Sequence, residues 1–184
     1  MSRADLLDRV ITYLAGAGVG DRSLRQIAAG AGTSHRMLIY HFGTRDGLLV
    51  EVVRAMEERQ RAALASLRSR TPREMALEFW RRLADPALAP YERLFFELYG
   101  AALGGQESVA PLLKGDGSGG DIVTSWLADE SMFAGLPLPQ ARMALAFSRG
   151  ALLDLLATGD REGVDAAVRA FVDLVWPLSP PEEP

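Results

Sequence analysis

The chain has 184 residues, with 20 Lys and Arg against 24 Asp and Glu, a formal net charge of −4, and no cysteine. Its 48% hydrophobic and 24% charged residues are typical of one globular domain, or of one domain plus a small module. The absence of cysteine excludes disulfide scaffolds, thiolate zinc sites, iron–sulfur centres and cysteine nucleophiles.

The first two predicted elements are helices. Apolar residues between Leu6 and Leu14 fall on one face of a 3.6-residue repeat, and the glycine-rich run 15–20 ends this helix. Ser23 and Gln26 form an S-x-x-Q capping box, which predicts that a second helix starts at Leu24. Glycines soon after this start keep the second helix short.

The rest of the chain also has helical periodicity. Thr33 and Ser34 are both good N-caps for a third helix through about Tyr40. Thr44 caps a fourth, longer helix that Thr71-Pro72 ends. Further helices are expected at about residues 73–84, 90–104, 121–133, 138–157 and 161–176. No segment shows sustained period-2 alternation, so the predicted fold is all-α with about nine helices.

One motif lies in the second and third helices. Ala28, Gly32 and Leu38 have the spacing of a helix-turn-helix. A small residue is needed where the two helices cross, a glycine suits the tight turn, and Leu38 packs with Ile27 inside the crossing. The third helix could then enter a DNA major groove, although a purely structural pair of helices can imitate the same spacing.

Candidate DNA contacts follow from this geometry. Arg36 could bond bidentately to guanine, His35 and Tyr40 can reach base edges or phosphates, and exposed helix N-termini suit phosphates. The candidates at or near the two helix starts are Ser34, His35, Arg36, Met37, Tyr40, His41, Thr44 and Arg45.

The distribution of charge is compatible with such a module. A net charge of −4, taken as an average, argues against a nucleic-acid partner. Residues 1–54, however, carry seven arginines against five acids, a net +2, whereas the remaining residues carry 13 bases against 19 acids, a net −6. This difference is small, but it places the basic part of the chain around the helix-turn-helix.

The segments 24–34 and 38–49, with the helix before them, resemble the N-terminal domain of the TetR family of transcriptional repressors. The resemblance covers about residues 3–54. It implies a dimeric regulator with an N-terminal DNA-binding domain (1–50), a ligand-binding and dimerisation domain (51–178) and a disordered tail (179–184).

Carried over by position, the resemblance adds Arg25, at the start of the second helix, to the residues that face base edges. His35, Arg36 and Met37 belong to the same group, whereas Tyr40, His41 and Arg45 would contact or lie beside phosphates. Two positions depart from the family pattern: Ile39 replaces a usual tyrosine, and Gly43 replaces a usual proline or lysine. We therefore expect one phosphate bond fewer per half-site.

The resemblance also implies a small-molecule pocket in the C-terminal part. Pockets are mostly apolar with few polar groups, so polar residues amid apolar ones are the better candidates. A packed core explains each aromatic candidate equally well, and Glu97 and Arg149 could pair with each other instead of contacting a ligand. The candidates are Phe96, Glu97, Tyr99, Leu103, Trp126, Phe147 and Arg149.

By the same resemblance, the helices at about 138–157 and 161–176 form a four-helix interface with a partner subunit. Small residues that would allow close approach, though internal packing could also explain them, are Ala144, Ala151, Ala166 and Ala170. Two-fold symmetry would place the two recognition helices about 34–36 Å apart on one face of the DNA. The expected operator is therefore a palindrome.

These features predict a DNA-binding regulator, a repressor that binds double-stranded DNA as a homodimer and is released by a small apolar ligand. His35 and His41 are six residues apart and do not share a helix face, so we expect no metal, no cofactor and no enzymatic activity. Residues 1–9 lack a cleavable signal pattern and no segment could span a membrane, which predicts a cytoplasmic protein. The alternative is a helical small-molecule-binding or adaptor protein whose helix-turn-helix no longer binds DNA.

Overall fold

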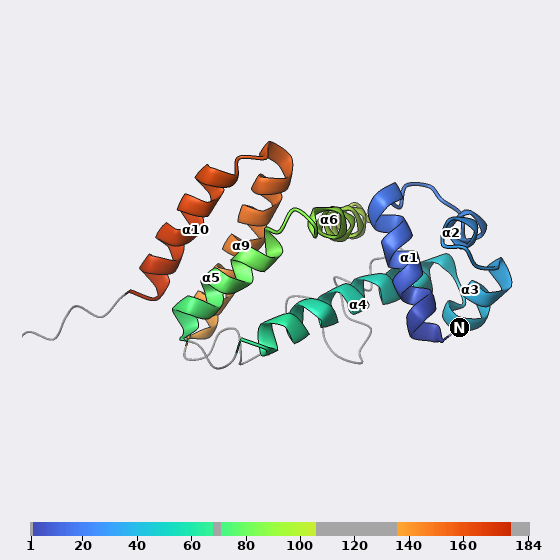
Figure 1. Ribbon diagram of the computed structural model, residues 1–184, viewed down its shortest axis with the longest axis horizontal. Helices are drawn as coiled ribbons and strands as arrows, with labels where there is room; N and C mark the ends of the chain where they lie inside the picture. The colour runs from blue at the N-terminus through green and yellow to red at the C-terminus, as the bar shows by residue number, and fades with distance from the viewer. Residues whose placement is uncertain (1, 68–70, 106–135, 178–184) are drawn as a thin grey trace, which may run out of the picture. The chain divides into compact units, whose positions relative to one another are not determined.

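The computed structural model describes residues 2–67, 71–105 and 136–177 (Figure 1). Within these residues the fold is all-α, as predicted. The described helices are α1 (Arg3–Ala17), α2 (Leu24–Gly30), α3 (His35–Phe42), α4 (Arg45–Ala65), α5 (Pro72–Leu83), α6 (Ala89–Leu103), α9 (Leu138–Thr158) and α10 (Arg161–Val175). The predicted helix 121–133, the candidate Trp126 and the predicted tail 179–184 lie outside the described residues.

The helix starts follow the capping residues in the sequence. The capping box at α2 is present, because Ser23 Oγ accepts the Gln26 amide and Gln26 Oε1 accepts the Ser23 amide at 2.8 Å. At α3 the cap is Ser34, whose hydroxyl accepts the Met37 amide at 3.2 Å. These bonds satisfy amides that a helix start otherwise leaves without acceptors. Local side-chain chemistry therefore sets where the two helices of the motif begin.

The chain divides into two compact units that do not follow the order of the sequence. Unit 1 consists of residues 1–60 and 89–125, and unit 2 consists of residues 61–88 and 126–184. Unit 1 therefore contains α6 in addition to the N-terminal helices, because α6 packs against α1. This division differs from the expected boundary near residue 50.

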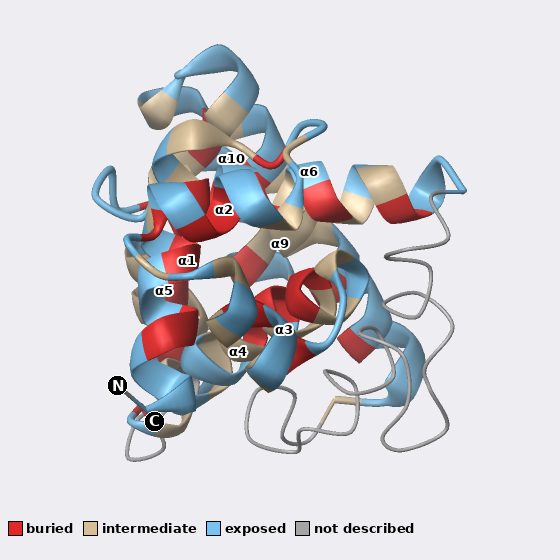
Figure 2. Ribbon diagram, turned by 90° about the vertical axis from the view of Figure 1, so that its right-hand side faces the viewer, coloured by how far each residue is buried: buried red, intermediate tan, exposed pale blue. Residues whose placement is uncertain are grey.

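Unit 1 has a core of aliphatic side chains that are almost completely buried. The inward faces of α1 and α3 carry buried residues in Figure 2. The largest fully buried side chains are Leu6, Val10, Ile11, Leu14, Ile27, Leu38, Leu48, Leu49, Val52, Leu94 and Leu98. Within this unit α1 packs against both α2 and α6, and α2 packs against α3.

In unit 2, α10 packs against both α5 and α9. Trp80 Nε1 donates a hydrogen bond to Asp165 at 2.6 Å, and Arg161 Nε donates to the same carboxylate at 2.8 Å. Burial opposes ionisation of Asp165, but the hydrogen bonds from Arg161 and Trp80 hold its pKa below the usual range. A polar cluster thus fixes one end of α10 against α5.

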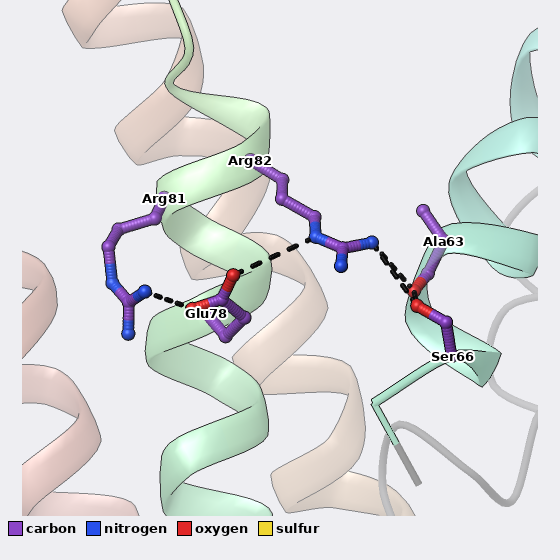
Figure 3. A network of polar contacts seen from close by, with 5 residues as sticks. All are labelled: Ala63, Ser66, Glu78, Arg81 and Arg82. Carbon is purple, nitrogen blue, oxygen red and sulfur yellow. Dashed lines mark hydrogen bonds and ion pairs between the residues drawn. The ribbon is translucent and has the colours of Figure 1, made fainter.

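The C-terminal end of α4 is capped by side chains of α5 (Figure 3). The Arg82 guanidinium donates to the carbonyl of Ala63 at 3.1 Å and to Ser66 Oγ at 3.3 Å, while Glu78 contacts both Arg81 and Arg82. The last carbonyls of a helix lack partners within that helix, and a cation also suits the negative end of its dipole. None of the described helices is long and apolar enough to cross a membrane.

Candidate DNA-binding surface and ligand cavity

The crossing of α2 and α3 has the geometry that the sequence motif requires. Ala28 is 1% exposed and Leu38 is fully buried, so the small residue does lie in the packed crossing. Gly32 has a φ of +65°, a conformation that favours glycine, and the Thr33 amide donates to the Ala28 carbonyl at 2.9 Å across the turn. The helix-turn-helix prediction is confirmed in its local structure.

Gly30 has a packing role that sequence reasoning missed, since it was regarded only as a residue that ends α2. A Cβ at this position would lie 2.1 Å from Cζ of Tyr13. The ring of Tyr13 on α1 therefore occupies the space that a side chain would need. The glycine itself is the only sign of this contact in the sequence. The spacing of apolar residues does not show that Tyr13 packs over Gly30.

The first turns of α3 present several of the predicted DNA-binding side chains at the surface. Arg36 and Tyr40 are exposed, Tyr40 by 79%, and Arg25 on α2 is exposed as well. His35, Met37 and His41 are half-buried on the same helix. Ser34 is exposed, but its hydroxyl caps α3.

Arg25 and Arg36 are available for an external partner. Among the residues that the structure describes, neither forms a hydrogen bond or an ion pair. Ile39, which replaces the usual family tyrosine, is 47% exposed and adds an apolar group beside Tyr40. The surface therefore combines two free guanidinium groups with a phenol, which suits contact with base edges and phosphates.

Arg45, which is predicted to contact or lie beside a phosphate, forms hydrogen bonds within the chain. Its Nε donates to the Arg22 carbonyl at 2.7 Å, and its Nη2 donates to the Gly20 carbonyl at 2.8 Å. Its neighbour Thr44 is similarly engaged, because its hydroxyl accepts the amide of Gly47 at 3.0 Å and caps α4. Arg45 thus joins the start of α4 to the loop between α1 and α2, a long-range contact that spacing could not reveal.

Glu97 holds the same loop from α6. Its carboxylate accepts the Val19 amide at 3.0 and 3.1 Å and the Gly20 amide at 2.8 Å. Sequence reasoning offered two roles for this residue, ligand contact or an ion pair with Arg149, and the hydrogen bonds in the structure correspond to neither. The half-buried Arg149 belongs to unit 2 and has interactions of its own.

Unit 2 contains an apolar cavity of about 50 Å³ between α5, α9 and α10. Phe147 and Phe171 stack on its wall with ring centroids 4.0 Å apart. The cavity is lined by Met75, Ala76, Phe79, Trp80, Leu83, Ala144, Phe147, Ser148, Val168, Phe171, Val172 and Trp176. The lining is almost entirely apolar, and the Ser148 hydroxyl donates to the Leu145 carbonyl at 3.0 Å.

Of the described residues predicted to bind a ligand, only Phe147 lines this cavity. Phe96, Tyr99 and Leu103 lie on α6 in unit 1, where Leu103 is 66% exposed and Tyr99 stacks on Phe95. The two polar candidates, Glu97 on α6 and Arg149 on α9, do not line the cavity, which is built almost entirely from apolar side chains. The residues that line the cavity have the same helical spacing as residues of a packed core, so the sequence pattern could not identify them as a cavity wall.

The predicted dimerisation helices carry an exposed seam of small and apolar residues. On α9 the exposed residues Met143, Ala146, Gly150, Leu153 and Ala157 repeat at intervals of three and four. On α10 Ala166, Ala170 and Leu174 are exposed, and Leu174 is 78% exposed. Ala144 is instead buried and lines the cavity, so its small size serves packing within the chain. Ala151 is half-buried.

These observations define a helix-turn-helix protein with a second, cavity-bearing unit. No protein-family model and no curated protein sequence matches the chain. Solved structures do. A protein from Rhodococcus sp. assigned to the TetR family of transcriptional regulators is 18% identical, with a TM-score of 0.72 over 94% of this chain and 97% of that one.

Two further structures are similar over nearly the full length. A TetR-family member from Streptomyces coelicolor A3 is 26% identical, with a TM-score of 0.60 and coverage of 96% and 98%. The multidrug-binding protein EbrR, in complex with imidazole, is 24% identical, with a TM-score of 0.67 and coverage of 98% and 92%. The chain has the fold of the TetR-family transcriptional regulators, a non-enzymatic family, which confirms the resemblance seen in residues 3–54.

Proposed function

We propose that the protein is a transcriptional repressor that binds a palindromic operator as a homodimer and is released by a small apolar ligand. The observation that carries the proposal is the surface of the helix-turn-helix, where Arg25, Arg36 and Tyr40 are exposed beside a capped and well-packed α3. Among the described residues, Arg25 and Arg36 form no hydrogen bond or ion pair, so their guanidinium groups are available for an external contact.

A dimer would give this small basic surface enough contacts. The net charge of residues 1–54 is only +2, so a single subunit offers few phosphate contacts. The seam on α9 has the three-and-four spacing that allows two helices to pack side by side, and its alanines and glycine allow close approach. A second copy of the chain is the partner that repeats this seam and doubles the DNA contacts.

The cavity in unit 2 is the proposed ligand site. An apolar cavity of about 50 Å³ is smaller than an engineered cavity of roughly 150 Å³ that binds benzene. A ligand larger than a few heavy atoms would therefore have to separate α5, α9 and α10. Such a ligand would shift the population of conformations of the protein, which is how it could release DNA. Binding of small molecules, as by the similar EbrR, is compatible with this site.

The DNA-binding proposal is tested with duplexes from the region upstream of the protein's own gene. Fluorescence anisotropy would measure the affinity at several salt concentrations. We expect affinity to fall steeply with salt, because bound phosphates release counterions. Arg36→Ala should cost about 1–3 kcal/mol and relax the preference at one base position.

Arg81→Ala is a matched control for this experiment, because Arg81 is exposed on α5 in unit 2. It removes the same charge and should leave affinity and sequence preference unchanged. If wild-type protein binds no upstream duplex more tightly than random DNA, the alternative of an adaptor protein without DNA affinity is favoured. A monomer by light scattering at micromolar concentration would contradict the homodimer.

The ligand proposal is tested with toluene as a small apolar probe. It should raise the thermal unfolding midpoint of the wild-type protein, since a ligand that binds only the folded state stabilises that state. In Ala144→Leu, whose added carbons occupy the cavity, the increase should be absent. An equal increase in both proteins would show that toluene binds elsewhere.

A further inference from the structure

The loop between α1 and α2 is held from two sides by charged side chains that are distant in sequence. Glu97 of α6 accepts its amides at Val19 and Gly20. Arg45, the first residue of α4, donates to its carbonyls at Gly20 and Arg22. The loop amides therefore donate to a side chain of α6, and the loop carbonyls accept from a side chain of α4.

The backbone of the loop suits a carboxylate at this point. Gly18 has a φ of +73° and Gly20 a φ of +45°, so the chain turns sharply here. The amides of Val19 and Gly20 both point at the Glu97 carboxylate. A Cβ on Gly18 would lie 3.4 Å from Oε2 of Glu97, which shows how closely the carboxylate approaches the backbone. An ionised acceptor makes stronger bonds to backbone amides than a neutral one does.

We propose that Glu97 is a positioning residue for DNA binding: its carboxylate fixes the α1–α2 loop and so the placement of the helix-turn-helix relative to α6. The inference rests on the proposed DNA-binding function, which it deepens. Without this carboxylate, the amides of Val19 and Gly20 lose the acceptor that they have in the structure.

This role can be separated from folding. Glu97 is exposed, whereas its helix is anchored by the buried residues Leu94, Phe95 and Leu98. Loss of the carboxylate therefore removes hydrogen bonds without creating a cavity. Local opening of a loop requires much less free energy than global unfolding does, so the helices should persist while the loop samples more conformations.

The experiment compares Glu97→Ala, Glu97→Gln and the control Glu58→Ala in full-length protein. Glu58 is an exposed glutamate on α4 of the same unit, so its substitution removes the same charge without touching the loop. We expect Glu97→Ala to lower affinity for the upstream duplex by roughly threefold to tenfold, with an unchanged dependence on salt. Glu58→Ala should stay within about twofold of wild type, a small effect typical of a surface change.

Two further measurements distinguish positioning from a general loss of stability. Amide hydrogen exchange followed by NMR should accelerate at Val19 and Gly20 in Glu97→Ala, and not in the α9 and α10 amides. Acetate, a free carboxylate, should restore part of the DNA affinity of Glu97→Ala when compared with chloride at the same ionic strength. Glu97→Gln should be intermediate, since its amide oxygen can still accept the Val19 and Gly20 amides but is uncharged, and its NH₂ group cannot replace Oε2 as an acceptor.

The outcomes that overturn the inference are specific. Faster exchange at Val19 and Gly20 with wild-type DNA affinity would show that the loop is held but does not position the DNA-binding helices. If Glu97→Ala does not fold, Glu97→Gln decides, and unchanged affinity in that variant refutes the proposal. If wild type itself does not bind the duplex, the proposed function fails first, and the exchange data still report whether Glu97 holds the loop.

Discussion

The two compact units differ in how tightly their described residues pack. Every large side chain that is less than 2% exposed lies in unit 1, on α1 to α4 and α6. The buried hydrophobic residues of unit 2 retain 2–8% exposure, for example 5% at Phe79 and 8% at Leu83, and its helices line the apolar cavity. The unit that carries the helix-turn-helix has the more completely buried core, while the other unit contains the cavity.

This difference is what a ligand-controlled DNA-binding protein needs. Base recognition depends on side chains placed to within a fraction of an ångström, which a dense core provides. A ligand site instead needs volume and walls that can move apart at small energetic cost. If the contrast in packing corresponds to a contrast in energy, core substitutions in unit 1 should destabilise the protein more than matching substitutions in unit 2.

Truncation of core leucines should cost more in unit 1. Leu38→Ala removes a fully buried side chain at the α2–α3 crossing and should lower the free energy of unfolding by about 4 kcal/mol. Leu83→Ala, at a residue that is 8% exposed and lines the cavity, should cost about 2 kcal/mol, because one side of that leucine already lacks packing partners. Urea unfolding measures both, and equal losses would contradict the contrast.

A buried carboxylate in unit 1 should make stability depend on pH. Glu92 is 4% exposed, and burial raises its pKa from 4.5 to about 7, although Gln60 donates to both carboxylate oxygens at 2.9 and 3.1 Å. Because the folded protein holds this proton more tightly, the stabilisation is complete below about pH 4.5 and is lost as pH rises through 7.

Glu92→Gln, which stays neutral, should therefore be more stable than wild type at pH 8 by about 2–3 kcal/mol, with little difference at pH 4.5. Urea unfolding of both proteins across this range measures the effect. Glu162→Gln, an exposed residue of α10, is the control and should show no such divergence. Parallel curves for wild type and Glu92→Gln would mean that Glu92 remains ionised in the folded protein.

The parts of the molecule that sequence could predict are those encoded locally. Capping residues such as Ser23 and Ser34 and the spacing of Ala28, Gly32 and Leu38 gave the helix-turn-helix, because these signals lie within one or two turns of chain. The roles of Glu97 and Arg45 depend on contacts 23–78 residues apart in sequence. No local sequence pattern distinguishes an arginine that bonds a distant backbone carbonyl from an arginine that is free to bind a DNA phosphate.

Adding the same two methyl groups in each unit should have different effects. Ala28→Val places them at the packed α2–α3 crossing and should cost about 2 kcal/mol, since overpacking forces neighbouring helices apart. Ala144→Val places them against the cavity and should change stability by less than about 1 kcal/mol. Thermal unfolding of the two variants measures the difference. A destabilisation of both by the same amount would mean that the cavity walls do not yield.

A still smaller effect is expected at Arg45, which either only bonds the α1–α2 loop or also contacts a DNA phosphate. If Arg45 only holds the α1–α2 loop, Arg45→Ala should weaken every duplex by about 1 kcal/mol, the typical worth of a hydrogen bond, and leave the salt dependence unchanged. If it contacts a phosphate, the slope of log affinity against log salt should fall by about one for each subunit. Arg36→Ala provides the reference, because it should alter base preference at one position. Anisotropy titrations at three salt concentrations therefore decide whether the dense unit uses this arginine internally or presents it to DNA.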